Sequence, residues 1–290
     1  MGGGKAIERL QMASQLSLTT YGKPLTVCYS GGKDSQVLVN LALKAGIPFR
    51  VMHNITTVDA PETIRTVRET FSMLESLGIE TEMSHPNTTM WRLIVQHRTP
   101  PTRLMRYCCK ELKERSAVGS FIATGVRSAE SRKRKSRESF DVLADKASGR
   151  EHYGDEVFLS NDNTEARRII ERCTPKNAMC VNPIIDWSDA DVLNWYWSEC
   201  EVHNPLYKDG FYRVGCVGCP QGGTRQQNHE FARYPKFKAG YVRAFGKMLD
   251  ARRERGLRIF DGWTDGQGVF DWWVGNGKIP GQLEIDWGEP

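Results

Sequence analysis

Short apolar runs alternate along the first half of the chain with longer stretches of helical periodicity. The apolar runs at residues 25–29, 48–53, 79–83 and 120–124 are rich in β-forming residues and short enough for buried strands. Between them, apolar positions recur every three or four residues, which is typical of amphipathic helices. Strands and helices that alternate in this way predict an α/β fold with parallel strands and right-handed crossovers.

Several of the expected helices carry boundary signals. Pro61 starts one helix and Gly78 stops it, Gly46 stops another, and Ser188 caps a third. From Glu138 to Ala166 periodicity fades and polarity rises, which indicates an excursion outside the core. The helices are expected over residues 6–21, 35–45, 61–77, 89–97, 108–117, 189–200 and 230–255.

The composition narrows the class of protein. Hydrophobic residues make up 39% and charged residues 26% of the 290 positions, which is ordinary for a globular protein and argues against disorder. The net charge of +5 suits anionic ligands. No apolar stretch approaches the length of a membrane span and no secretory signal opens the chain, so we expect a cytoplasmic protein without a membrane partner.

The segment Ser30-Gly31-Gly32-Lys33-Asp34-Ser35 joins the first expected strand to the helix that follows it. A helix start presents free backbone N–H groups and a positive dipole end, which together bind anions. Gly31 and Gly32 permit the close backbone approach that such a site needs, and Lys33 adds a positive charge. The spacing excludes a Walker A loop. The segment therefore predicts a phosphate site.

Four of the eight cysteines form two pairs, Cys108-Cys109 and Cys216-x-x-Cys219. In a cytoplasmic chain such pairs indicate metal or redox chemistry more than disulfides. Four thiolates from two segments can hold an iron–sulfur cluster, and adjacent cysteines suit a cube better than a single tetrahedral zinc ion. Zinc and inert buried thiols stay open as alternatives. Lys110, next to Cys109, is expected to offset the charge of a cluster.

Both motifs resemble one protein family. The segment 30–35 is similar to the pyrophosphate loop of the adenine nucleotide alpha hydrolase superfamily, whose members bind the β,γ-phosphates of ATP. The cysteine pattern resembles the phosphoadenosine phosphosulfate reductase family of that superfamily, in its cluster-bearing branch. Residues 124–127, 182–187 and 204–211 are also similar. The resemblance implies a three-layer α/β sandwich with a mostly parallel sheet, followed by a helical and irregular C-terminal appendage.

The chain departs from the reductases of this family in two ways. They use a nucleophilic cysteine in a C-terminal tail, whereas no cysteine follows Cys219 here, so we expect no such tail. They also tend to lose the intact loop, which this chain keeps. It therefore looks more like sulfur-transfer members of the superfamily that activate an acceptor with ATP. Two alternatives stay open: sulfonucleotide reduction with an external thiol, and a non-catalytic nucleotide-binding subunit of a larger complex.

The resemblance and the residue chemistry together assign roles. Lys33, Asp34 and Arg127 are expected to be catalytic, since a guanidinium at a strand end suits phosphate. Residues 1–225 should form the nucleotide-binding domain and residues 226–290 a helical, Trp-rich extension. The metal ligands are expected to be Cys108, Cys109, Cys216 and Cys219. The nucleotide-binding residues are expected to be Ser30, Gly31, Gly32, Lys33, Asp34, Ser35, Asp59, Gly125 and Arg127.

These roles imply a set of cofactors and partners. The cofactors are a 4Fe–4S cluster, ATP or an adenylyl sulfate, and Mg²⁺, with Asp59 placed to orient ribose or the magnesium ion. The partners are a sulfur donor or a thiol reductant protein, a nucleic-acid acceptor, and further copies of the chain in a homo-oligomer.

Overall fold

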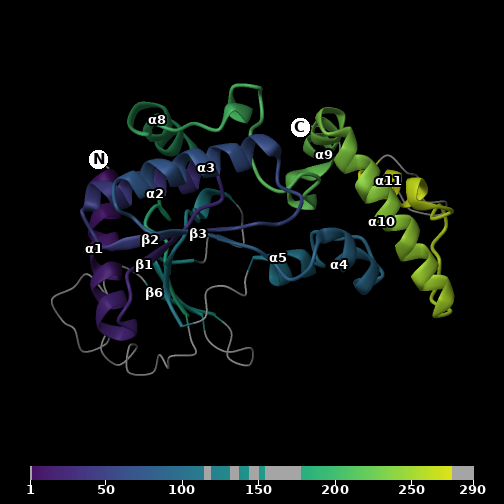
Figure 1. Cartoon of the computed structure of the whole chain (residues 1–290), viewed down its shortest axis with the longest axis horizontal. Coiled ribbons are helices and arrows are strands. Elements are labelled where there is room, and N and C mark those ends of the chain that lie inside the picture. The colour runs from purple at the N-terminus through teal and green to yellow at the C-terminus, as the bar shows by residue number, and fades with distance from the viewer. Residues whose placement is uncertain (1, 114–118, 131–136, 144–149, 154–177, 276–290) are drawn as a thin grey trace. The chain divides into compact units, whose positions relative to one another are not determined.

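The computed structural model describes residues 2–113, 119–130, 137–143, 150–153 and 178–275 (Figure 1). The chain forms two compact units that interleave along the sequence and do not follow the predicted boundary at residue 225. We call them the sheet unit and the helical unit. The sheet unit comprises Met1–Ile55, Ala60–His85 and Arg115–Gly215, and the helical unit comprises Thr56–Asp59, Pro86–Glu114 and Cys216–Pro290.

The sheet unit is built on a mostly parallel sheet. Its described strands are β1 (Leu25–Cys28), β2 (Phe49–Asn54), β3 (Thr81–Ser84), β4 (Phe121–Ala123), β5 (Phe140–Leu143), β6 (Arg150–Tyr153) and β7 (Ala178–Val181). Their order is β3-β2-β1-β4-β7-β5-β6. The first five in this order run parallel, whereas β5 pairs antiparallel with both β7 and β6. Because β1 lies between β2 and β4, the loops that follow β1 and β4 emerge side by side.

Alternate strand residues pack against helices of the same unit. Leu25 and Val27 of β1 and Phe49 and Val51 of β2 are buried in the main core, whereas the intervening Thr26 is not part of that apolar cluster. This period of two is the one expected of a strand with different faces. The helices that contribute side chains to this core are α1 (Gly2–Tyr21), α2 (Lys33–Ala45), α3 (Pro61–Ser76) and α8 (Asp189–Glu199). The short helices η1 (Ser128–Glu130) and η3 (Pro205–Tyr207) lie in loops.

The helical unit has a core of its own, rich in aromatic side chains. Trp273 is buried against Tyr241 (ring centroids 4.7 Å apart), Phe245 (5.3 Å) and Phe231 (5.9 Å). Helices α10 and α4 pack against each other, as do α10 and α11. The described helices of this unit are α4 (Met90–His97), α5 (Tyr107–Leu112), η4 (Pro220–Gly222), α9 (Gly223–Arg233), α10 (Pro235–Glu254) and α11 (Gly266–Trp273). No helix in the described part of either unit combines the length and apolarity that crossing a bilayer requires.

The α/β class, the mostly parallel sheet with flanking helices and the helical C-terminal part are confirmed. Ser188 caps α8 in a full capping box, and Gly46 ends α2 with a φ of 62°. The predicted helix over residues 230–255 is broken, because Pro235 lacks a backbone N–H and starts α10 immediately after α9.

The prediction of an excursion over residues 138–166 is wrong for part of its length. Strands β5 and β6 lie within it and extend the sheet. Phe140 pairs with Val181 of β7, so the strand is stabilised by a partner distant in sequence that local periodicity does not reveal. Residues 144–149 and 154–166 of this segment lie outside the described residues.

Candidate functional site

The loop between β1 and α2 has the strand–turn–helix geometry that its sequence predicts. Gly31 has a φ of +74°, a left-handed conformation that L side chains rarely adopt. A Cβ atom on Gly31 would lie 2.7 Å from Cγ2 of Thr63, so α3 also requires a glycine there. Gly32 is the N-cap of α2. The backbone of the loop is therefore fixed by local conformation and by close packing.

Replacing Gly31 with alanine should destabilise the sheet unit by about 2 kcal/mol, because the substitution adds backbone strain to a steric clash. The free energy of unfolding, measured by urea denaturation, checks this. Gly78→Ala is the matched control, since Gly78 also has a positive φ (77°) but has open space around it. Thr63→Ser in the Gly31→Ala background removes the clashing methyl and should recover part of the loss. Equal losses for Gly31→Ala and Gly78→Ala would contradict the packing argument.

The two serines of the loop hold its shape. Ser35 Oγ donates to the carbonyl of Gly32 (2.9 Å), accepts from the backbone N–H of Ser30 (3.1 Å) and lies 3.0 Å from Ser30 Oγ. These hydrogen bonds close the loop on itself. In this arrangement both hydroxyl groups are engaged within the loop. The groups that the loop offers to an anion are therefore its backbone N–H groups and the positive charge of Lys33.

A segment from later in the sheet unit braces the loop. Asn204 is 1% exposed, and its Nδ2 donates to the carbonyl of Gly31 (3.0 Å) and to Thr63 Oγ1 (3.2 Å). The backbone N–H of Lys33, at the first position of α2, donates to the hydroxyl of Tyr207 (2.8 Å). Burial raises the pKa of Tyr207, so its hydroxyl stays neutral. In the sequence this segment stands out only by its family similarity, which predicts no role for Asn204 or Tyr207.

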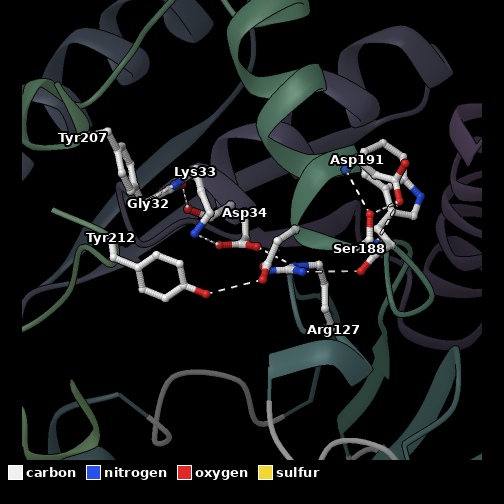
Figure 2. A network of polar contacts seen from close by, with 11 residues as sticks. Gly32, Lys33, Asp34, Arg127, Ser188, Asp191, Tyr207 and Tyr212 are labelled. Atoms are coloured by element: carbon white, nitrogen blue, oxygen red, sulfur yellow. Dashed lines mark hydrogen bonds and ion pairs between the residues drawn. The ribbon is translucent and has the colours of Figure 1, made fainter. Parts of the chain in front are cut away.

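Lys33 and Asp34 are the first two members of a series of charged side chains that contact one another (Figure 2). Lys33 is 6% exposed, and its Nζ lies 3.5 Å from Asp34 Oδ2. The same Nζ lies over the rings of Tyr207 and Tyr212, at 5.5 Å and 5.4 Å from the ring centroids. Electrostatic attraction between an ammonium group and an aromatic face stabilises this position. The loop thus carries a nearly buried cation held between two tyrosines.

Arg127 links Asp34 to α8. Its Nε donates to Asp34 Oδ1 (2.7 Å) and one terminal nitrogen donates to Asp189 Oδ1 (2.7 Å), while the Arg127 side chain is only 2% exposed. The hydrogen bond from Arg127 lowers the pKa of Asp189. Burial alone would lower the pKa of Arg127, but the charges of Asp34 and Asp189 raise it. Arg127 therefore acts here as a positioning residue for Asp34, and its direct contact with phosphate stays a prediction.

Gly125 lies close to the start of α2, and its expected contact with the nucleotide stays a prediction. A Cβ atom there would be 3.0 Å from the backbone carbon and oxygen of Asp34, so this glycine permits the loop after β4 to approach α2 closely. The structure thus brings the segments 30–35 and 125–127 together in the sheet unit, through the adjacency of β1 and β4.

Asp59 belongs to the helical unit. Its carboxylate accepts hydrogen bonds from the backbone N–H (2.7 Å) and the hydroxyl (2.6 Å) of Thr56, and its backbone forms a β-bridge with Cys216. This carboxylate therefore shapes the short loop beside one cysteine pair. Its expected role in orienting ribose or Mg²⁺ stays a prediction.

All four predicted metal ligands lie in the helical unit. Cys108 and Cys109 are in the first turn of α5, and Cys216 and Cys219 form a tight turn before η4 in which Cys219 N–H donates to the carbonyl of Cys216 (3.1 Å). Gly218 has a φ of +77°. Side chains of α9 and α10 hold this turn: Glu230 accepts from the N–H of Gly218 (2.6 Å), Gln227 donates to its carbonyl (3.0 Å), and Tyr241 donates to the carbonyl of Val217 (2.9 Å).

The charges of the four sulfur atoms influence one another. Cys108 donates a hydrogen bond to Cys109, which raises the pKa of Cys108 and, together with a hydrogen bond from Arg106, lowers the pKa of Cys109. Thiolate charge on Cys216 and Cys219 also raises the pKa of Cys108. The charge of Cys216, followed by those of Cys109 and Cys219, raises the pKa of Lys113. The cation predicted from the sequence was Lys110, whereas Lys113 was not predicted; both side chains are exposed.

The donor set fits a metal centre by type and number. Four free thiols from two segments share one unit, as cysteine-bound clusters require. No three histidine, cysteine or carboxylate groups of the described residues, however, are arranged so that they could hold a metal ion. A tetrahedral zinc ion draws its sulfurs to within roughly 4 Å of one another, given a Zn–S distance of about 2.3 Å. The four thiols would therefore have to rearrange to bind either a zinc ion or an iron–sulfur cluster.

Comparison with known proteins identifies related sequences. A family model described as the phosphoadenosine phosphosulfate reductase domain matches residues 24–222. Two uncharacterized proteins of Methanocaldococcus jannaschii are similar: MJ0066 is 27% identical over 86% of this chain and 46% of its own length, and MJ0973 is 26% identical over 89% and 58%. The chain thus spans about half the length of the curated relatives it matches.

A solved structure is also similar in part. The crystal structure of phosphoadenylyl-sulfate (PAPS) reductase from Candida auris, a phosphate complex, has a TM-score of 0.44 to this chain and 16% sequence identity. The match covers 72% of this chain and 88% of the other.

Proposed function

The chain belongs to the phosphoadenosine phosphosulfate reductase domain family, and we propose that it is an enzyme that uses ATP to adenylate an acceptor for sulfur transfer. The observation that carries this proposal is the intact Ser30–Ser35 loop, in which a glycine turn, the start of α2 and the nearly buried Lys33 converge. Backbone N–H groups at a helix start, next to a lysine, suit a di- or triphosphate. A pyrophosphate-binding loop is useful to an enzyme whose leaving group is pyrophosphate.

The proposed reaction has two steps. An acceptor oxygen attacks the α-phosphorus of ATP, the bond between that phosphorus and the bridging oxygen breaks, and pyrophosphate leaves. A hydrosulfide ion then attacks the activated carbon or phosphorus of the acceptor, a carbon–sulfur or phosphorus–sulfur bond forms, and AMP leaves with the acceptor oxygen. Lys33 and the loop N–H groups stabilise the negative charge that develops on pyrophosphate in the first step.

Asp34 is the carboxylate that would meet the Mg²⁺ ion accompanying ATP. Magnesium binds to proteins through one or two carboxylates together with the phosphates of the substrate. Arg127 holds one oxygen of Asp34 by a hydrogen bond from Nε and leaves Oδ2 toward Lys33. In this proposal Arg127 fixes the direction of the carboxylate, and Lys33 and Mg²⁺ share the charge of the phosphates.

The assay for this function is the release of pyrophosphate from ATP, tested with nucleic acids and small molecules as acceptors. Sulfonucleotide reduction is the second candidate, and the family description favours it. In that reaction two thiols are oxidised to a disulfide while the sulfate sulfur of adenosine phosphosulfate leaves AMP as sulfite. Sulfite release with an added thiol, without pyrophosphate release from ATP, would select the reductase. Binding of ATP without either reaction, with candidate partners present, would select a non-catalytic subunit.

We further propose that Cys108, Cys109, Cys216 and Cys219 hold a 4Fe–4S cluster. When bound, such a cluster would supply iron that binds sulfur. The sharing of one unit by the four thiols and the cationic Lys113 beside them support the proposal, because a cation offsets the negative charge of a thiolate-bound cluster.

Protein purified without oxygen should contain about four iron and four sulfide ions per chain. The double variant Cys216→Ser/Cys219→Ser should lose both to background, because two of the four ligands are removed. Cys200→Ala is the control, since Cys200 is a buried cysteine of the sheet unit and should leave the iron content unchanged. One zinc ion per chain, or iron retained by the double variant, would contradict the cluster.

A further inference from the structure

A cleft of about 890 Å³ lies between α4 and α10 in the helical unit. Both helices are shown in Figure 1, and they pack against each other. Four cationic side chains line the cleft: Arg92 of α4 and Lys236, Arg243 and Lys247 of α10. Among the residues that the structure describes, no aspartate or glutamate lines it. The proposed function makes no use of this feature.

The four cations are available to a ligand. Each is exposed, and within the described residues none of the four side chains forms an ion pair. Lys236, Arg243 and Lys247 are spaced seven and four residues apart, which places them along one side of α10. They span about 16 Å of helix axis, at 1.5 Å per residue. A row of this length is longer than the phosphate groups of a single nucleotide, and it matches the length of a chain of several phosphates.

Two aromatic side chains line the same cleft. Trp91 is half-buried and is held edge-on by Tyr241, with ring centroids 4.9 Å apart and an interplanar angle of 81°. Gly240 permits this position, because a Cβ atom there would lie 2.8 Å from the Trp91 ring. Phe237, also half-buried, lies one turn before Gly240 on α10. The cleft therefore combines an anchored indole with a neighbouring phenyl ring.

We infer that this cleft binds a single-stranded segment of nucleic acid. Cations in a row neutralise successive phosphates, and aromatic side chains stack on unpaired bases, which is the combination found in single-strand binding sites. At about 3.4 Å per stacked nucleotide, the row on α10 corresponds to about five nucleotides. An acidic protein segment would use the cations but not the aromatic rings. The inference extends the proposed function by naming its acceptor class.

The test is fluorescence anisotropy with labelled oligo(U) and oligo(dT) of about twelve nucleotides, without ATP, between about 50 and 200 mM salt. If all four cations contact phosphates, the slope of log affinity against log salt should be about −3, since each contact on a single strand contributes about −0.7. RNA and DNA binding would both support the inference, and a preference for oligo(U) would indicate contact with the 2′-hydroxyl.

The variant Arg243→Ala/Lys247→Ala should weaken binding at low salt by about tenfold or more and reduce the slope to about −1.4. Trp91→Leu should weaken binding by about tenfold while leaving the slope unchanged, because stacking is not ionic. Arg65→Ala/Arg68→Ala is the matched control: these are two exposed cations on α3, and their loss should change neither quantity. Circular dichroism confirms that each variant is folded.

Several results would overturn the inference. Unchanged affinity in Arg243→Ala/Lys247→Ala would do so, as would equal losses in the Arg65→Ala/Arg68→Ala control. Tighter binding of duplex DNA, or of polyglutamate, than of single strands would also contradict it. Lys33→Ala should bind the oligonucleotides as well as the parent protein does. A failure of ATP activation and a failure of this cleft to bind therefore give different results.

Discussion

The Lys33→Ala variant should lose ATP-dependent pyrophosphate release by about 10²–10³-fold, the effect of removing one preorganised group that stabilises charge in a transition state. Lys33 is the cation of the β1–α2 loop, and Tyr207, Tyr212 and Asp34 keep its ammonium group close to the start of α2. The measurement is the initial rate of pyrophosphate release at saturating ATP. Lys44→Ala is the matched control, because Lys44 lies on the same helix but is exposed and paired with Glu199.

The stability of Lys33→Ala should change by only about 1 kcal/mol. The variant loses its interactions with two tyrosine rings, each of modest size, whereas Asp34 keeps its hydrogen bond from Arg127. Lys33→Met, which preserves most of the side-chain volume, separates lost charge from lost packing and should be as inactive as the alanine variant. Normal turnover in either variant would remove the basis of the proposed function.

The Arg127→Met variant should lose about 3 kcal/mol of unfolding free energy, because the buried guanidinium no longer satisfies the Asp34 and Asp189 carboxylates. The value lies at the lower end of the range for breaking a buried ion pair, since the Asp189 side chain is 51% exposed and water can replace part of the lost contact. Urea denaturation at neutral pH measures the effect. Arg68→Met, at an exposed position on α3, should change stability little.

The same variant should also change how stability depends on pH. Arg127 lowers the pKa of Asp189 in the folded protein. A lowered carboxyl pKa stabilises the fold above the unfolded pKa of about 4, and this contribution disappears as the pH falls through the folded pKa. The parent protein should therefore lose more stability than Arg127→Met between about pH 5 and pH 3.

A second substitution tests the origin of the loss. Asp34→Asn in the Arg127→Met background removes a carboxylate charge that has lost its hydrogen bond from Arg127 and keeps only Lys33 as an ionic partner, so it should recover part of the stability. No recovery, together with an unchanged pH profile, would mean that Arg127 stabilises the fold by packing alone.

The sequence was informative where a motif is local. The turn at residues 30–35, the helix that follows it and the four paired cysteines lie in short contiguous segments, and each could be located from residue types and spacing. The antiparallel strands β5 and β6 could not, because their stability depends on pairing with β7 and not on their own periodicity.

The residues that brace the loop could not be predicted from the spacing of residues in the sequence either. Tyr207 and Asn204 act through contacts more than 170 positions away in the sequence, and Asp189 meets Arg127 across 62 positions. The pattern of the Asn204–Tyr207 segment was visible only as a similarity. The guanidinium of Arg127 donates hydrogen bonds to two carboxylates that the sequence did not reveal as its partners, and its expected contact with phosphate stays a prediction. A strand-end arginine alone does not reveal which anion it binds.

The interleaving of the two units has a consequence for biogenesis. Cys108 and Cys109 are translated roughly a hundred residues before Cys216, so at 5–20 residues per second they leave the ribosome about 5–20 s before their partners exist. During that interval the first pair of thiols lacks the second pair, with which it would hold the proposed cluster. Because the proposed cluster binds all four sulfur atoms, peroxide should damage chains that are pulse-labelled during synthesis more readily than the mature, cluster-bearing protein.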